Sequence, residues 1–310
     1  MVEKKNRMGY FLTVFGGTCW AVSGACGQFL FENRGLDANW LVTMRLLLAG
    51  LLLSGYSVVR WRGKALEVFR SWRSVGALLV LGMMGLGLCQ YAYFRSIELS
   101  NAATATTLQY TGLVLVMLWV AITDRRLPRR SEVIAVACAM AGAYLLATHG
   151  DPSQLVLSTT ALFWCLVGAA AFAIYSVQPR GIISRYGTLP VTGFGMLIAG
   201  LVLCVLFKPW HLVGEWDGVT VAGLIFIVIF GTLLSFCCYL EGVRRIGASK
   251  GSILAAVEPV ASALLSVFWL GVPLGTMDFA GIALIVAAMM LLAGDGSAKP
   301  DQSEKSLKNR

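Results

Sequence analysis

The sequence predicts an all-α polytopic membrane protein, with ten transmembrane helices arranged as two inverted five-helix repeats and both termini in the cytoplasm. The first observation is composition: 57% of the 310 residues are hydrophobic and 13% are charged, whereas soluble domains carry about 25% charged residues. A soluble fold could not hide so much apolar surface from water, and in lipid it has no need to. The second observation is an internal repeat, and the third is the uneven distribution of positive charge.

The internal repeat relates the two halves of the chain at an offset of about 150 residues. Residues 130–148 resemble 277–293, residues 95–112 resemble 241–259, and residues 43–53 resemble 193–203. We count five spans in each unit, and an odd unit placed twice in one membrane must point in opposite directions. Inverted repeats of this kind build secondary transporters, whose central site opens to either side of the membrane in turn.

Apolar stretches close to 20 residues long, the length of one membrane crossing, define the spans. They are 9–31, 38–59, 74–94, 102–122, 132–149, 158–178, 188–207, 219–240, 249–271 and 277–293. The first repeat is therefore residues 1–149 and the second is residues 150–294. Residues 295–310 are polar and are expected to form a disordered cytoplasmic tail.

Positive charge gives the orientation, because Lys and Arg collect in cytoplasmic loops. The 25 Lys and Arg residues fall on the side of the two termini and the even-numbered loops, with the exceptions Arg34, Arg45, Arg95 and Lys208. The net charge of +9 is explained by this bias and by attraction to anionic lipid. It therefore requires no nucleic acid as a partner.

In the first repeat, the first span follows Lys4, Lys5 and Arg7 and so resembles a signal peptide. We expect a retained helix, because the segment recurs inside the chain as the sixth span. Three spans of this repeat have a small or polar face, made of Trp20, Ser23, Gly24, Gly27 and Gln28 on the first, Gly87, Gln90, Tyr91 and Phe94 on the third, and Thr104, Thr107 and Thr111, with Tyr110 close by, on the fourth. The second span, apart from Arg45, and the fifth span are apolar nearly all round.

In the second repeat, the seventh and tenth spans are likewise apolar. Polar or aromatic faces are formed by Trp164, Gly168, Ala171, Tyr175 and Gln178 on the sixth span and by Thr232, Ser235, Phe236 and Tyr239 on the eighth. The ninth span carries Glu258, ten residues from its start and so near the midplane. Pro259 follows and breaks the backbone ladder around Ala255.

The sequence offers no sign of a metal site or a cofactor. The two histidines, His149 and His211, lie at the outer ends of spans. The cysteines lie within predicted spans, where we interpret them as packing residues; they are Cys19, Cys26, Cys89, Cys138, Cys165, Cys204, Cys237 and Cys238. The expected partners are the lipid bilayer and a small-molecule substrate, and the sequence leaves a homodimer open.

The stretch from about residue 9 to 293 resembles the EamA-type fold of the drug/metabolite transporter superfamily. The strongest matches are SNAATATTLQ at 100–109, the Arg of MRLLLAG at 44–50, and SILAAVEPVASALLS at 252–266, and they look most like its carboxylate/amino-acid/amine transporter branch. The family often ends the fourth helix of a repeat with Leu-Gly-Glu, which this chain lacks. The resemblance implies a cavity lined by the first, third and fourth helices of each repeat, with the fifth helix outside.

Candidate substrate-binding residues come from these faces. They are Trp20, Ser23, Gln28, Gln90, Tyr91, Thr107, Tyr110, Trp164, Tyr175, Ser235, Tyr239 and Glu258. The competing explanation is packing, because small residues let membrane helices approach and Ser or Thr bond across helices or to their own backbone. Tyr and Trp near span ends can also be interfacial anchors. The amide of Gln90 is hardest to explain by packing, since within a span it needs hydrogen-bond partners.

Two ionisable side chains within spans leave alternatives open. Glu258 is either a proton relay or cation contact, or a structural group that bonds to its neighbours beside Pro259. Arg45 lies about 10 Å below the outer surface at the helical rise. It either has an architectural role, by snorkelling outward or pairing with Glu32 or Asp37, or it binds a substrate anion.

These features predict an alternating-access secondary transporter, an exporter of small polar metabolites such as amino acids or related carboxylates and amines, in the bacterial inner membrane. The sequence contains no GxxxxGK[ST] phosphate loop, so ATP is not expected to drive it. A membrane enzyme would need His, Asp, Glu or Cys clustered at one membrane face, and a channel would repeat around a pore in like orientation. Both remain alternatives.

Overall fold

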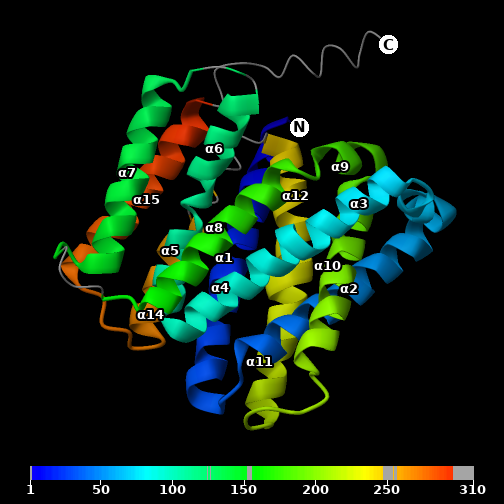
Figure 1. Cartoon of the computed structure of the whole chain (residues 1–310), viewed down its shortest axis with the longest axis horizontal. Coiled ribbons are helices and arrows are strands. Elements are labelled where there is room, and N and C mark those ends of the chain that lie inside the picture. Colours follow the sequence, from blue (N-terminus) through cyan, green and yellow to red (C-terminus); the bar gives the residue numbers. More distant parts are fainter. Residues whose placement is uncertain are drawn as a thin grey trace.

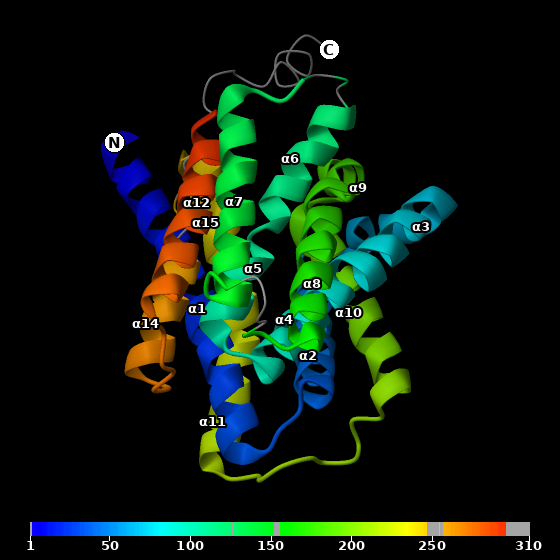
Figure 2. The same cartoon turned by 60° about the vertical axis from the view of Figure 1, so that its left-hand side comes forward.

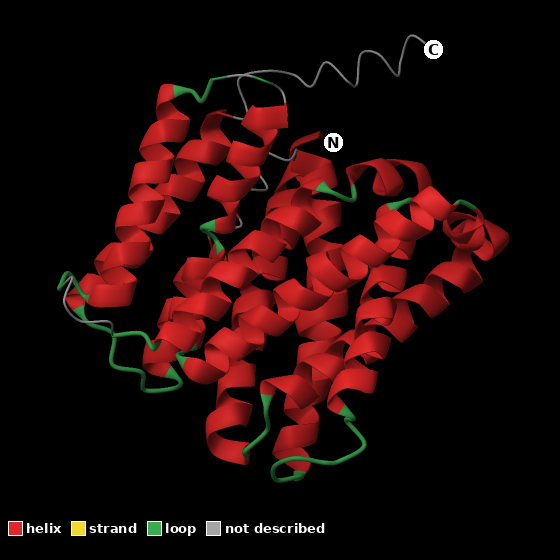
Figure 3. Cartoon of the chain, in the orientation of Figure 1, coloured by secondary structure: helices red, strands yellow, loops and turns green. Residues whose placement is uncertain are grey.

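The protein is a bundle of helices joined by short loops (Figure 3). The structure, a computed structural model, describes residues 2–123, 125, 127–151, 156–246, 254 and 257–295, and no strand occurs among them. The elements are α1 (Val2–Arg34), α2 (Ala38–Trp61), the 3₁₀ helix η1 (Arg62–Arg70), α3 (Trp72–Val80), the π-helical η2 (Leu81–Gly87), α4 (Leu88–Leu99), α5 (Ala102–Gln109), α6 (Gly112–Thr123), α7 (Arg130–Thr148), α8 (Thr159–Val177), α9 (Arg180–Tyr186), α10 (Thr188–Phe207), α11 (Gly218–Val228), the π-helical η3 (Ile229–Leu234), α12 (Ser235–Ile246), α14 (Val257–Phe268) and α15 (Thr276–Asp295).

Eight helical stretches among the described residues are long and apolar enough to cross a membrane. They run from Arg7–Arg34 to Gly218–Tyr239 and occupy the places of the first eight predicted spans. Two shorter apolar helices, Val257–Phe268 and Thr276–Leu291, stand where the ninth and tenth were predicted. The start of the predicted ninth span and the tail beyond Asp295 lie outside the described residues, so the count of ten stays a prediction.

Several helices differ in detail from the predicted spans. The fourth predicted span is broken at Tyr110 and Thr111 into α5 and α6, and the third and eighth each contain a π-helical segment. A π-helix holds more residues per turn than an α-helix and often occurs at functional sites. The segments η2 and η3 begin at Leu81 and Ile229, 148 residues apart, which matches the offset of the sequence repeat.

Side-chain caps explain where several helices begin. The carboxylate of Asp37 accepts a hydrogen bond from the Trp40 amide at 2.7 Å, and the Asn101 side chain accepts one from the Thr104 amide at 2.8 Å. Such caps satisfy amide groups at the first turn that have no partner within the helix. They fix the starts of α2 and α5, and α5 forms part of the wall of the site described below.

The helices pack in equivalent pairs across the two halves. α2 packs against α10 and α7 against α15, and the contacts of α1 with α12 and α14 are matched by those of α8 with α4 and α6. The α2–α10 contact is itself symmetric, because a Cβ on Gly50 would lie 2.6 Å from Leu197 Cα and one on Gly200 would lie 2.6 Å from Leu47 Cα. Gly50 and Gly200 are 150 residues apart in the sequence, and so are Leu47 and Leu197.

The α7–α15 pair stands at one edge of the bundle, beside α6 (Figure 1). His149 Nε2 and Asp278 Oδ1, 2.9 Å apart, join the two helices at one end. The start of α1, the end of α15 and α9 lie at the same end of the molecule in both views, whereas α11 begins and α14 ends at the opposite end (Figures 1 and 2). The two ends of the described helical chain therefore lie on one side.

Candidate functional site

A cavity lies between helices of both halves. Its wall is formed by α1, α2, η2, α4 and the α5 end from the first half, and by α8, α12 and α14 from the second. The lining residues are Trp20, Arg45, Leu86, Cys89, Gln90, Tyr93, Gln109, Tyr110, Phe172, Tyr175, Phe236 and Glu258. The helices α7 and α15 contribute none of them. This matches the lining implied by the family resemblance, with Arg45 from α2 as an addition.

The cavity is small, with a volume of about 80 Å³. Ligand pockets usually measure about 300–1,000 Å³, so this conformation has room for the head group of a small solute and for little more. A whole metabolite would need the walls to move apart.

Arg45 is the positive group of the cavity. Its side chain is 2% exposed, so it does not snorkel outward. Nε donates to Thr232 Oγ1 at 2.8 Å, Nη2 donates to the Gly231 carbonyl at 3.0 Å, and the guanidinium carbon lies 4.9 Å from the centre of the Phe94 ring. The expected pairing with Glu32 or Asp37 is wrong: Gln28 donates to Glu32 at 2.8 Å, and Asp37 caps α2.

Glu258 is the negative group. Its Oε2 accepts a hydrogen bond from the Tyr110 hydroxyl at 2.6 Å, across the contact between α14 and the α5 end. Glu258 lies in α14, whose described part begins at Val257. Of the preceding residues expected in the same helix, most lie outside the described residues, so its depth in the span stays a prediction. The expected break near Ala255 lies outside the described residues.

Aromatic rings form much of the remaining wall. Trp20 of α1 meets two rings of α12, with centroid separations of 5.2 Å to Phe236 and 5.1 Å to Tyr239. On the other side, Phe172 and Tyr175 of α8 are 5.1 Å apart and edge to face. Aromatic faces carry negative electrostatic potential and attract cations, so this wall suits an apolar or positively charged group.

Polar groups of α4 and α5 complete the lining. Gln109 Nε2 donates to Cys89 Sγ at 3.2 Å, while the Gln90 amide bonds to none of the described residues. Behind the cavity, the hydroxyls of Tyr93 and Thr106 are 2.9 Å apart and those of Thr106 and Ser262 are 3.3 Å apart. These buried hydrogen bonds fix α4, α5 and α14 relative to one another. Because Gln90 takes no part in them, its amide is available to a solute.

Five of the twelve candidate substrate-binding residues line the cavity: Trp20, Gln90, Tyr110, Tyr175 and Glu258. Tyr239 lies next to it, against Trp20. Tyr91 and Trp164 lie elsewhere. Tyr91 donates to Asn39 Oδ1 at 2.9 Å and packs against Trp164 and Phe207.

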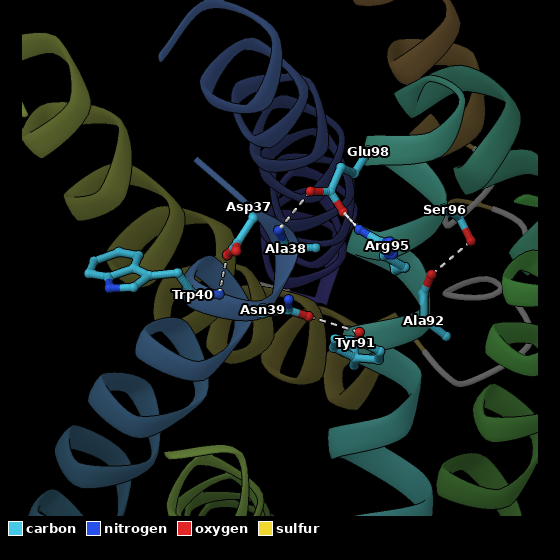
Figure 4. Close-up of polar contacts among 9 residues, drawn as sticks. All are labelled: Asp37, Ala38, Asn39, Trp40, Tyr91, Ala92, Arg95, Ser96 and Glu98. Carbon is cyan, nitrogen blue, oxygen red and sulfur yellow. Dashed lines mark hydrogen bonds and ion pairs between the residues drawn. The ribbon is translucent and has the colours of Figure 1, made fainter. Parts of the chain in front are cut away.

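Figure 4 shows Tyr91 directed at Asn39, beside a polar network that joins the start of α2 to the end of α4. In that network Glu98 accepts from the Ala38 amide at 3.3 Å and pairs with Arg95. The Ser96 hydroxyl donates to the Ala92 carbonyl of its own helix at 2.7 Å. The polar groups here are engaged with one another, so Tyr91 serves the joint between α2 and α4.

The remaining sequence candidates lie outside the cavity lining and contact other parts of the protein. Gln28 accepts from the Ala102 amide at 2.7 Å and so supports the start of α5. Thr107 donates to the Ala103 carbonyl at 2.7 Å, and Ser235 donates to the Thr232 carbonyl at 3.2 Å. Ser23 lies against Gly231 of η3. These contacts are the ones that the packing alternative describes.

Five cavity residues were not singled out from sequence for any role in the site: Leu86, Cys89, Tyr93, Gln109 and Phe172. Gln109 carried a usable signal, because it is an amide within a span, as Gln90 is. Arg45 also carried one, since a charged side chain inside a membrane helix usually faces the interior. Cys89 and Phe172 look like ordinary packing residues in the sequence.

Known proteins resemble this chain in family, sequence and fold. The sequence model of the EamA-like transporter family matches residues 7–148 and again residues 159–294. The uncharacterized inner membrane transporter YicL of Salmonella typhimurium is 34% identical over 290 residues, which are 94% of this chain and 96% of that protein. The threonine/homoserine exporter RhtA of Escherichia coli is 25% identical over 264 residues, 82% of this chain and 81% of that one. A crystal structure with 18% identity superimposes with a TM-score of 0.61, covering 96% of this chain and 99% of the other.

Proposed function

The chain belongs to the EamA-like transporter family of the drug/metabolite transporter superfamily and is a multi-pass membrane protein, and from that premise we propose that it exports small polar metabolites by alternating access. The substrates are amino acids or related carboxylates and amines. The observation that carries the proposal is the cavity, which brings one cationic and one anionic side chain, Arg45 and Glu258, together with aromatic rings inside a membrane bundle.

The proposed architecture is ten spans in two inverted five-helix repeats. The two family matches, the equivalent helix pairs and the placement of η2 and η3 support it. In such a fold the two halves rock around a central site, and the small volume of the cavity fits a conformation in which the site is constricted.

The proposed location is the bacterial inner membrane, with both termini in the cytoplasm. The distribution of Lys and Arg supports this orientation, and the name of the YicL relative supports the membrane. The direction of transport is proposed from the RhtA relative, which is named an exporter. A homodimer is compatible with this architecture and is not required by it.

Comparing metabolites in cells with and without the protein tests the proposal. Mass spectrometry should find a small polar metabolite enriched in the medium and depleted in the cells that express the protein. The variant Leu86→Trp places an indole in the cavity wall and should abolish the difference. Its matched control is Leu79→Trp, on the same predicted span but 42% exposed on the outer surface of the bundle.

Purified protein in size-exclusion chromatography should show that both variants fold. Unchanged metabolite levels in expressing cells would contradict export. Full activity of Leu86→Trp would show that the cavity is not on the transport path.

A further inference from the structure

The guanidinium of Arg45 has unused donors that reach the cavity. A guanidinium carries five N–H groups, and Arg45 makes two hydrogen bonds, through Nε to Thr232 and through Nη2 to Gly231. Within the described chain its Nη1 donates to nothing, and no carboxylate forms an ion pair with it. The cation is therefore buried without a countercharge in contact.

The carboxylate of Glu258 lines the same cavity and also has an unused hydrogen-bonding atom. Oε2 accepts from Tyr110, and Oε1 accepts no hydrogen bond from the described residues. Glu258 and Arg45 line the same cavity without forming an ion pair. Two opposite charges thus face a common space and remain apart.

Buried charges inside a membrane protein are costly unless an opposite charge or several hydrogen bonds compensate them. An anionic solute would compensate Arg45 but would face the negative Glu258. A cationic solute would have the reverse problem. A solute that carries an ammonium and a carboxylate on the same carbon compensates both charges at once, and its small charged head group fits a cavity of about 80 Å³.

We propose that Arg45 and Glu258 form a subsite for the zwitterionic head group of an α-amino acid. The substrate carboxylate accepts from the free N–H groups of Arg45, with the Gln90 amide as a further donor. The substrate ammonium donates to Glu258 Oε1 and lies near the Trp20 ring, which attracts cations. This assignment names the substrate class of the transporter proposed above and rests on that function.

The bonds of Arg45 to η3 hold the guanidinium in place before a substrate arrives. Thr232 and Gly231 both belong to the π-helical segment, and the Phe94 ring supports one face of the guanidinium. A donor group that is already oriented loses less conformational entropy on binding. Arg45 is thus a preorganised anion-binding group.

Binding to purified protein in detergent tests the subsite through charge. L-Alanine, L-serine and L-threonine are first titrated by calorimetry against the wild-type protein. The one that binds best is then compared with its amide, which lacks the carboxylate, and with its 2-hydroxy acid, which lacks the ammonium. The wild type should prefer the amino acid over both analogues by roughly 10-fold to 100-fold, as expected for hydrogen bonds to charged groups.

Each variant should remove one preference only. Arg45→Gln should no longer prefer the amino acid over its amide, but should still prefer it over the hydroxy acid. Glu258→Gln should no longer prefer the amino acid over the hydroxy acid, but should still prefer it over the amide. Arg45→Lys, which keeps the charge but loses the forked geometry, is used if the Gln variant does not fold. The control Arg34→Gln removes an arginine that pairs with Asp217 outside the cavity, and should leave both preferences unchanged.

The outcomes separate the subsite from the transport function. Failure of all three amino acids to bind the wild type, or retention of both preferences in the variants, overturns the subsite. Counterflow of the same amino acid in proteoliposomes tests transport independently. Charge-dependent binding without counterflow would support the subsite and refute transport. Counterflow by the wild type, together with variants that keep both preferences, would support transport and refute the subsite.

Discussion

The close contact between α2 and α10 predicts that replacing either of its two glycines with alanine destabilises the protein. Gly50 and Gly200 occupy equivalent places, and each lets the backbone of the facing helix approach. In Gly50→Ala the new Cβ would stand 2.4 Å from the Leu197 backbone nitrogen, whereas ordinary contact begins at 3.4 Å. The helices would have to separate by about 1.0 Å, the difference between these two distances.

Overpacking of this kind costs about 1–3 kcal/mol, because the backbone of α10 has no flexible end that could give way. Gly200→Ala should cost a similar amount. The double variant should cost less than the sum of the two, since the separation forced by one substitution partly accommodates the other, and such neighbours do not add.

The assay is the melting temperature of the purified protein, followed by the loss of the monodisperse peak in size-exclusion chromatography after heating. The matched control is Gly55→Ala on the same helix, where a Cβ would meet nothing within 4 Å. It should be neutral or slightly stabilising, because Ala favours a helix over Gly by about 0.5–1 kcal/mol. Equal melting temperatures for Gly50→Ala and Gly55→Ala would refute the close approach of α2 and α10.

Three further predictions concern topology, coupling and packing. Reporters fused after Arg310 should behave as cytoplasmic, and those in the loops near Asp37, Pro152 and His211 as external; an external C-terminus would end the inverted-repeat argument. Glu258→Gln should keep the Tyr110 hydrogen bond and therefore the melting temperature, although it loses the contact with the substrate ammonium; if its residual transport no longer responds to a pH gradient, Glu258 is a proton relay. Glu258→Leu removes the acceptor and should lower the free energy of unfolding by roughly 1–3 kcal/mol. Tyr93→Phe breaks the bond to Thr106 and should destabilise by about 1 kcal/mol, whereas Tyr56→Phe, at a side chain that is 55% exposed, should not change the melting temperature.

Hydrophobic length was sufficient to predict an all-helical membrane protein and the positions of the first eight apolar helices. Interruptions within helices could not be predicted in this way. The break at Tyr110 and the π-helical segments η2 and η3 depend on contacts with other helices, and Gly231 and Thr232 are ordinary residues for an apolar span. The helical connections η1 and α9 were missed because apolar length identifies only segments that cross the membrane.

The polar and aromatic faces of the predicted helices identify only part of the cavity lining, for a physical reason. A polar or aromatic face shows that a helix has neighbours, but not which neighbour it meets. Tyr91 and Gln90 are adjacent in sequence and therefore point about 100° apart on the helix; Gln90 lines the cavity and Tyr91 bonds to Asn39. The sequence left the role of Arg45 open between architecture and anion binding, because its bonds to Thr232 and Gly231 of η3 depend on how α2 packs against η3.

The matching positions of η2 and η3 bear on the history of the chain. A π-helical turn contains one residue more than the α-helical ladder around it accommodates, so each copy carries the same irregularity at the same place. If both halves descend from one unit, as the sequence repeat indicates, a single event before the duplication explains both irregularities, whereas two independent events would have had to strike the same turn. The irregular turn would then be older than the duplication and already present in the ancestral unit.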